Sequence, residues 1–324
     1  MIGYIRLLLA TAVLLSHVGV RFNGLNPGVI AVVIFYMIAG GVVAHIWQDV
    51  LPEGRNKLFY FYKDRCLRIF PLYIYTACLT LIFLAITSYG SPNYSALALL
   101  NNALIMPLNY YMVIDSTVMT KPAWNLIPPA WSLGTELQAY LLLPFALKYR
   151  RFRIMIVVLS LIIYVAANLS FIHTDYFGYR LLPGVLFIFI LGGSLKSRGI
   201  TQSYWLSTTL FIASVILYIS ITYQPIPPQM YAQETLIGLM IGIPLLTAAH
   251  HLNIKVPYNR DMGSLSYGIF LTHFLIIWFI DYSVLVSSDG WVYYLTVFVL
   301  AAMVAKLGIS LIDIRIDRHR IKKQ

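Results

Sequence analysis

A series of long apolar stretches constrains the fold of this chain more than any other feature of its sequence. A helix needs about 20 apolar residues to cross the hydrocarbon core of a membrane. Only 11% of the 324 residues are charged, compared with roughly a quarter in soluble globular proteins. The sequence therefore predicts an all-α polytopic membrane protein and excludes almost every soluble class. About ten transmembrane helices are expected, at residues 4–20, 28–47, 70–88, 131–147, 154–172, 180–195, 204–222, 232–249, 264–282 and 291–312.

A shorter apolar segment, residues 97–107, lies between the third and fourth of these stretches and contains Asn101 and Asn102. It is too short to cross the membrane, so we expect one re-entrant or interfacial piece there. The chain has no internal repeat, and an inverted-repeat transporter therefore gains no support. We expect residues 1–324 to form a single integral-membrane domain.

The basic residues orient the predicted spans, because positively charged loops stay on the cytoplasmic side of a membrane. With ten crossings, one side holds 18 of the 23 lysines and arginines, in residues 48–69, 148–153, 196–203, 250–263 and 313–324. Both termini are therefore expected in the cytoplasm. This asymmetry also accounts for the net charge of +11, so no nucleic-acid partner is expected.

Cysteine and histidine spacing indicates no metal site. Cys66 and Cys78 are twelve residues apart, which does not resemble a disulfide framework or a structural zinc site. His250 and His251 are adjacent in a basic loop, without the spacing at which two ligands face one metal ion.

Ionisable residues inside membrane spans are candidate functional groups, because they are costly to bury there. The first span contains Arg6 and His17, eleven residues apart. That is about three helical turns, so both face the same way and are separated by roughly 16 Å. Arg6 then lies near the cytoplasmic mouth and His17 near the outer end. Two structural interpretations stay open: Arg6 as an anchor that extends to the membrane surface, and His17 in a hydrogen bond between helices.

Glu136 lies about a turn and a half inside the fourth predicted span. That span runs from outside to inside, so Glu136 is expected at a depth similar to that of His17. A carboxylate there needs a partner, and a carboxylate beside a histidine fixes its tautomer and stabilises the imidazolium. We expect Glu136 to contact His17, as a catalytic pair or as a structural pair that joins two helices.

Arg65 and Arg68 lie three residues apart at the cytoplasmic start of the third span. This spacing places both guanidinium groups on one helical face, which suits a phosphate-rich ligand. Contact with anionic lipid headgroups is the alternative. His273 lies near the middle of the ninth span, where it is a proton relay, a substrate contact or a residue that joins helices.

Taken in order, five segments resemble the acyltransferase-3 family, the membrane-embedded O-acetyltransferases of bacterial polysaccharides. They are Arg6 followed by ten residues and His17, the Gly/aromatic residues 28–41, the basic residues 65–73, the Trp131-Ser132-Leu133-x2-Glu136 motif with Tyr140 and Pro144, and residues 266–273. The resemblance runs from about residue 4 to residue 282. It departs from the family at Ala39, which stands before Gly40 where relatives usually have serine.

The resemblance implies transfer of an acetyl group from cytoplasmic acetyl-CoA to a hydroxyl of a cell-surface or lipid-linked glycan. It implies a stand-alone enzyme, without a fused esterase-like domain and without a permanently bound cofactor, in the bacterial cytoplasmic (inner) membrane. His17 would be the base, with Glu136 beside it. CoA would lie against Arg6, Arg65 and Arg68. The residues expected to contact the acceptor are Trp131, Ser132, Arg180 and His273.

Two other function classes remain open at this point. The same ionisable residues suit a secondary transporter for an anionic solute, or a flippase-like partner in polysaccharide assembly. Consumption of acetyl-CoA would separate the enzyme from both.

Overall fold

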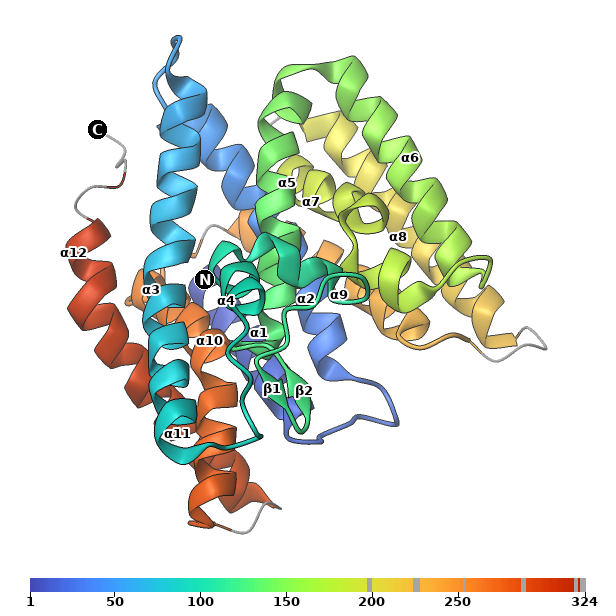
Figure 1. Ribbon diagram of the computed structural model, residues 1–324. Helices are drawn as coiled ribbons and strands as arrows, with labels where there is room; N and C mark the ends of the chain where they lie inside the picture. Colours follow the sequence, from blue (N-terminus) through green and yellow to red (C-terminus); the bar gives the residue numbers. More distant parts are fainter. Residues whose placement is uncertain (197–199, 224–227, 253, 287–289, 318–319, 321–324) are drawn as a thin grey trace.

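Helices form nearly all of the regular structure in this chain (Figure 1). The structure is a computed structural model that describes residues 1–196, 200–223, 228–252, 254–286, 290–317 and 320. In that part of the chain, eight helices are long and apolar enough to cross a membrane. The predicted fold class, an all-α polytopic membrane protein, is confirmed. The number of crossings and their orientation stay predictions.

The elements follow one another along the chain with few strands among them. The first half contains α1 (Ile2–His17), α2 (Pro27–His45), the π-helix η1 (Ile46–Val50), α3 (Lys57–Thr87), α4 (Ala96–Leu104), the 3-10 helix η2 (Met106–Tyr110), β1 (Met119–Thr120), β2 (Ala123–Trp124), the 3-10 helix η3 (Pro128–Ala130) and α5 (Trp131–Lys148). The second half contains α6 (Arg150–Asn168), the π-helix η4 (Asp175–Arg180), α7 (Leu182–Lys196), α8 (Ile200–Tyr223), α9 (Ala232–Leu252), α10 (Asn259–Ser283), α11 (Trp291–Gly308), the π-helix η5 (Ile309–Asp313) and α12 (Ile314–Asp317).

Each of the ten apolar stretches coincides with a helix. Several boundaries differ from the prediction, and two of these differences concern candidate site residues. The third helix, α3, begins at Lys57 rather than at residue 70, so the basic segment around Arg65 and Arg68 is helical. The sixth stretch begins with the π-helix η4, whose last residue is Arg180, and continues as α7. A π-helix repeats every fifth residue in its hydrogen bonds, so a search for a 3.6-residue period does not find it.

Helices α2, α7 and α10 form the interior of the molecule, whereas α6, α8 and α11 expose most of their apolar side chains. Figure 1 shows α3 and α11 on one side and α6 and α8 on the other. The interior helices bury nearly every face, and the peripheral ones present the wide apolar surface that lipid would cover.

Two glycines bring α2 and α7 into close contact. A Cβ atom on Gly40 would lie 1.8 Å from the carbonyl oxygen of Phe189, and one on Gly192 would lie 1.8 Å from that of Met37. Such distances leave no room for any side chain, so small residues let the two backbones touch. The Ala39-Gly40 pair noted in the sequence thus lies at a helix crossing.

Helix α1 packs along α10, and polar contacts join the two at several levels. The backbone N–H of Gly3 donates to the side-chain oxygen of Asn259 at 2.8 Å. The Ser266 hydroxyl donates to the carbonyl oxygen of Arg6 at 2.6 Å. Arg6 therefore lies near one end of the α1–α10 helix pair, and His17 lies at the opposite end of α1.

The short segment between the third and fourth predicted spans forms α4 and η2. Asn102 is buried there; its amide donates to the carbonyl oxygens of Ala98 at 2.8 Å and Ser116 at 2.7 Å, and its Oδ1 accepts from the Leu126 backbone at 2.9 Å. The two asparagines that mark this segment as polar in the sequence thus hold its loop in place. Whether it enters a membrane stays a prediction.

Candidate functional site

A cavity of about 1060 Å³ lies between α1, α2, α3, α5 and α10. Its lining includes five of the residues singled out in the sequence: Arg6, Arg65, Arg68, Ser132 and Glu136. We call this space the arginine cavity. Its volume is at the upper end of those usual for small-molecule sites. The predicted cations thus lie around a space that is large enough for a sizeable ligand.

Three of the arginines that line the cavity, Arg6, Arg65 and Arg68, are held in different ways; Arg260 and Arg320 also line it. Arg65 is buried and donates to the Asp64 carboxylate, which also accepts from Arg320 Nε at 3.1 Å. Arg68 lies over the ring of Tyr267, 5.2 Å from its centroid. The Nε of Arg6 is buried and has no hydrogen-bond partner among the described residues. Among the described residues, Arg6 therefore brings a buried donor without a partner to this cavity.

Glu136 supplies negative charge to the arginine cavity. Its carboxylate accepts a hydrogen bond from the Tyr140 hydroxyl, one turn further along α5. Its charge also interacts with that of Arg6. The guanidinium of Arg65 lies over the ring of Tyr140, 5.7 Å from its centroid. Glu136 therefore belongs to the network of the cations.

His17 has a different neighbour from the one expected. Its Nδ1 lies 3.0 Å from Nε2 of His273, and the two rings are stacked at 5.2 Å between centroids. His17 is exposed, whereas His273 is fully buried. We call these residues the histidine pair. Within the described residues, no hydrogen bond or ion pair joins His17 to Glu136, which corrects the expected contact.

Hydrogen bonds assign the tautomers of the histidine pair. Nδ1 of His273 lies 3.0 Å from the carbonyl oxygen of Ile269, and only a protonated nitrogen can donate to a carbonyl. Nε2 of His273 is then unprotonated and accepts the proton of His17 Nδ1. In neutral His17 this leaves Nε2 as the nitrogen with a free lone pair. The pair thus fixes which nitrogen of His17 can accept a proton.

The arginine cavity approaches the histidine pair without including it. Phe270 lines the cavity and lies one turn before His273, with 6.4 Å between the two rings. Ser132 also lines the cavity, and its hydroxyl donates to the Pro129 carbonyl at 3.0 Å. A ligand in the cavity would have to extend past Phe270 to reach His17.

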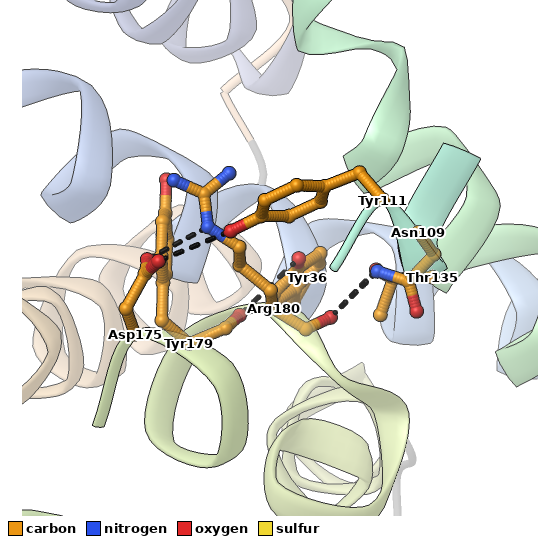
Figure 2. A network of polar contacts seen from close by, with 7 residues as sticks. All are labelled: Tyr36, Asn109, Tyr111, Thr135, Asp175, Tyr179 and Arg180. Carbon is orange, nitrogen blue, oxygen red and sulfur yellow. Dashed lines mark hydrogen bonds and ion pairs between the residues drawn. The ribbon is translucent and has the colours of Figure 1, made fainter. Parts of the chain in front are cut away.

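Arg180 and Trp131 belong to a second polar group, shown in Figure 2 except for Trp131. Nε of Arg180 donates to Asp175 at 2.7 Å, and the guanidinium lies 4.3 Å from the ring centroid of Trp131. The rings of Tyr111 and Tyr179 are each 5.3 Å from it. We call these five residues the Arg180 box. Arg180 is also close enough to His17 for their charges to interact.

The hydroxyl of Tyr111 completes the acidic side of this box. It donates to the second oxygen of Asp175 at 3.2 Å. Partial burial raises the pKa of the Tyr111 phenol; the charge of Arg180 opposes this rise, and the Asp175 carboxylate adds to it. The hydroxyl therefore stays protonated and keeps donating. We refer to the histidine pair and the Arg180 box together as the outer cluster, after the predicted orientation.

Sequence reasoning missed several residues that the structure places in these groups. Asp175 and Tyr111 come from segments outside the predicted spans, and Tyr267 carries the ring beneath Arg68. Asp175 lies five residues before Arg180, a spacing that becomes informative only once a π-helix is assumed. A search for acidic residues near Arg180 would have found it.

Comparison with known protein families gives one match across nearly the whole chain. Residues 2–307 match the family described as "Acyltransferase domain". The match includes every residue of the arginine cavity, the histidine pair and the Arg180 box that is named above, apart from Arg320.

Two relatives align with parts of the chain. A protein of Aquifex aeolicus (strain VF5), described as "Uncharacterized protein", is 39% identical over 216 residues, which cover 65% of this chain and 96% of the relative. "Protein 2 in picA locus" of Rhizobium radiobacter is 28% identical over 132 residues, which cover 36% of this chain and 66% of that protein. No solved structure matches.

Proposed function

This chain belongs to the acyltransferase family that its residues 2–307 match, and on that premise we propose that it is an acetyl-CoA-dependent O-acyltransferase. The acyl group, most simply acetyl, passes from a coenzyme A thioester to a hydroxyl of a glycan or lipid-linked sugar. The observation that carries the proposal is the histidine pair, in which His17 presents an unprotonated Nε2 at the end of a helix that also carries Arg6.

The arginine cavity suits the donor. Coenzyme A carries several phosphate charges, and arginine pairs with phosphate through two parallel hydrogen bonds. Arg6 has a buried Nε without a partner among the described residues, which a phosphate oxygen would satisfy. Arg65 and Arg68 line the same space. A helical rise of eleven residues puts His17 roughly 16 Å from Arg6, a distance that the slender pantetheine arm of the donor can bridge.

His17 is the general base in the proposed reaction. Its Nε2 takes the proton from the acceptor hydroxyl while the hydroxyl oxygen attacks the thioester carbonyl carbon. The carbon–sulfur bond then breaks, and the imidazolium returns the proton to the departing thiolate. The products are an ester and free CoA. His273 holds the His17 ring in the productive tautomer, and acts as a positioning residue.

Glu136 acts on the donor side of the site. It lines the arginine cavity, accepts from Tyr140 and interacts with the charge of Arg6. We propose that it keeps Arg6 in place for the donor and offsets part of the positive charge of the empty site. This role replaces direct contact with His17.

The acceptor reaches His17 from the side that carries the outer cluster. With the orientation that the basic residues predict, this is the outer face of the bacterial cytoplasmic (inner) membrane. Trp131 and Arg180 lie on this side, which supports an acceptor such as a lipid-linked glycan. Donor and acceptor would then enter from opposite sides and meet at His17.

Turnover of radiolabelled acetyl-CoA by purified protein in liposomes tests the proposal. We expect wild-type protein supplied with lipid-linked glycans to release CoA and label the glycan, and His17→Ala to do neither. His251→Ala, at an exposed position near the end of α9, is the matched control and should keep full activity. If the wild-type protein neither binds nor consumes acetyl-CoA, the proposal is wrong. Solute movement without that consumption would indicate a transporter.

A further inference from the structure

The guanidinium of Arg180 is held on one edge only. Its Nε donates to Asp175 at 2.7 Å, and Asp175 in turn accepts from Tyr111. The side chains of Arg180 and Asp175 are 17% and 11% exposed. The two terminal nitrogens of Arg180 form no hydrogen bond with any described residue, and in Figure 2 they point away from Asp175. A strongly hydrogen-bonding edge is therefore left without a partner.

Aromatic rings surround this guanidinium and limit the directions from which a ligand can approach. Its central carbon is 4.3 Å from the Trp131 ring and 5.3 Å from the rings of Tyr111 and Tyr179. Cation–π contacts of this kind hold a cation by its faces. A ligand is thus directed to the free edge, where two N–H groups project side by side.

Buried hydrogen bonds fix the backbone that carries Arg180. Its carbonyl oxygen accepts from Thr135 Oγ1 at 2.8 Å and from Asn109 Nδ2 at 3.0 Å (Figure 2). Thr135 and Asn109 are fully buried and bond to each other at 2.8 Å. Nε2 of Gln138 donates to Asn109 Oδ1 at 2.9 Å. The arginine therefore projects from a rigid base, as a preorganised binding group does.

The local helix type makes this arrangement possible. Asp175 and Arg180 are the first and last residues of the π-helix η4. A π-helix is wider than an α-helix and is rare in proteins, but those that occur are often at functional sites. Its five-residue step brings Asp175 beneath Nε of Arg180, which leaves the terminal nitrogens free.

From these contacts we propose that the Arg180 box binds an oxyanion, a carboxylate or phosphate carried by the acceptor. A planar edge with two parallel N–H groups matches the two oxygens of such a group. That the bound molecule is the acceptor rests on the proposed function; the oxyanion site itself does not. The substrate class becomes an acidic glycan or a sugar phosphate, held by its charge so that a hydroxyl lies at His17.

Binding of small anions in the absence of any acyl donor tests the site directly. Purified wild-type protein is titrated with glucuronate, methyl phosphate and glucose, while Trp131 fluorescence reports binding 4.3 Å from Arg180. Trp131→Phe identifies which part of the signal belongs to this residue. We expect at least one of the two anions to bind at least about tenfold more tightly than glucose, a difference of roughly 1.4 kcal/mol. The anion that binds more tightly tells a carboxylate acceptor from a phosphate acceptor.

Arg180→Lys is the decisive variant because lysine keeps the charge for Asp175 but lacks the two-pronged edge. We expect the variant to fold and to lose the preference for the anion by about tenfold, roughly 1.4 kcal/mol. Lys121→Gln removes an exposed cation from a loop on the same predicted side and should change nothing.

Two results would overturn the inference: equal binding of glucuronate, methyl phosphate and glucose, or an unchanged preference in Arg180→Lys. Neither depends on acetyl-CoA. A protein that binds the anion but does not consume acetyl-CoA would retain the oxyanion site and refute the proposed function alone.

Discussion

The arginine cavity and the outer cluster hold their charges in different ways. In the arginine cavity, cations from several elements, among them α1 and α3, surround an open space of about 1060 Å³, and part of their charge is balanced by Asp64 and Glu136. In the outer cluster, the ionisable groups contact one another directly: His17 contacts His273, and Asp175 accepts from Arg180 and Tyr111. The first arrangement suits binding of a large anion, and the second suits positioning of small groups.

The difference in construction has a structural source. The cavity is lined by long helices whose side chains extend into a shared space. The Arg180 box and its support draw partly on short elements: the π-helix η4 carries Asp175 and Arg180, and the 3-10 helix η2 carries Asn109. Irregular elements can place side chains on one side without following the 3.6-residue period, whereas regular helices place residues three or four apart on one face. Mutations in the arginine cavity should therefore affect binding of the donor, whereas mutations in the outer cluster should affect turnover or binding of the acceptor.

Substitution of His273 is expected to give the largest difference between the effect on kcat and the effect on KM for acetyl-CoA. His273→Phe keeps a ring at the position but removes the acceptor for His17 Nδ1–H, so the tautomer and orientation of His17 are lost. We expect kcat to fall roughly 100-fold, within the range that general-base catalysis contributes. Steady-state kinetics with acetyl-CoA would show KM for the donor changed less than about twofold, because the arginine cavity is intact.

His273→Gln gives the matched test of positioning. Its side-chain oxygen can accept from His17 in place of Nε2, so partial recovery of kcat is expected relative to His273→Phe. Equal losses in both variants, accompanied by a higher KM for acetyl-CoA, would show that His273 only packs the helices together.

Substitution of Arg6 is expected to have a smaller effect, and on KM for the donor rather than on kcat. Arg6→Gln removes the cation whose Nε lacks a partner among the described residues. One charge-assisted hydrogen bond to a phosphate contributes about 1.5–3 kcal/mol, so KM for acetyl-CoA should rise at least about tenfold. kcat at saturating donor should change little.

Arg150→Gln is the control for Arg6, since Arg150 is an exposed cation at the start of α6 and does not line the cavity. We expect no change in KM for that variant. A loss of kcat in Arg6→Gln with unaltered KM would contradict the division between the two regions.

The smallest effect is expected at Tyr111. Tyr111→Phe removes the hydroxyl that donates to Asp175 at 3.2 Å but keeps the ring beside Arg180. A single hydrogen bond contributes about 0.5–1.5 kcal/mol, so affinity for the better-bound anion, glucuronate or methyl phosphate, should fall about threefold. Fluorescence titration checks this, and donor KM should be unaltered. A loss as large as that of Arg180→Lys would mean that Asp175, rather than the free edge of Arg180, controls the site.

Much of the site could be predicted from the sequence because a helix fixes which residues share a face. The helical period predicts that Arg6 and His17 share one face of their helix. The spacing of Arg65 and Arg68 likewise predicts a shared face, and both line one cavity. Apolar length alone located every long helix. These are local properties, set within one turn or one span of the chain.

The partner of His17 could not be predicted in the same way. Depth in the membrane made Glu136 the expected partner, but the rotation of α5 and α10 about their axes decides which side chain His17 contacts. That rotation depends on packing, such as the bond between Ser266 and the Arg6 carbonyl that ties α10 to α1. Asp175 was missed for a related reason, because the π-helix that presents it to Arg180 has no signature in a 3.6-residue pattern.

Hydrophobic length and helical period are properties of contiguous residues, so the sequence is sufficient to identify a helical membrane protein and the helical faces that carry charge. Which charged groups contact one another depends on how the helices pack. Contacts between His17 and His273, or between Arg180 and Tyr111, join residues far apart in the chain. Their geometry depends on how neighbouring helices rotate and how closely glycines such as Gly40 let them approach.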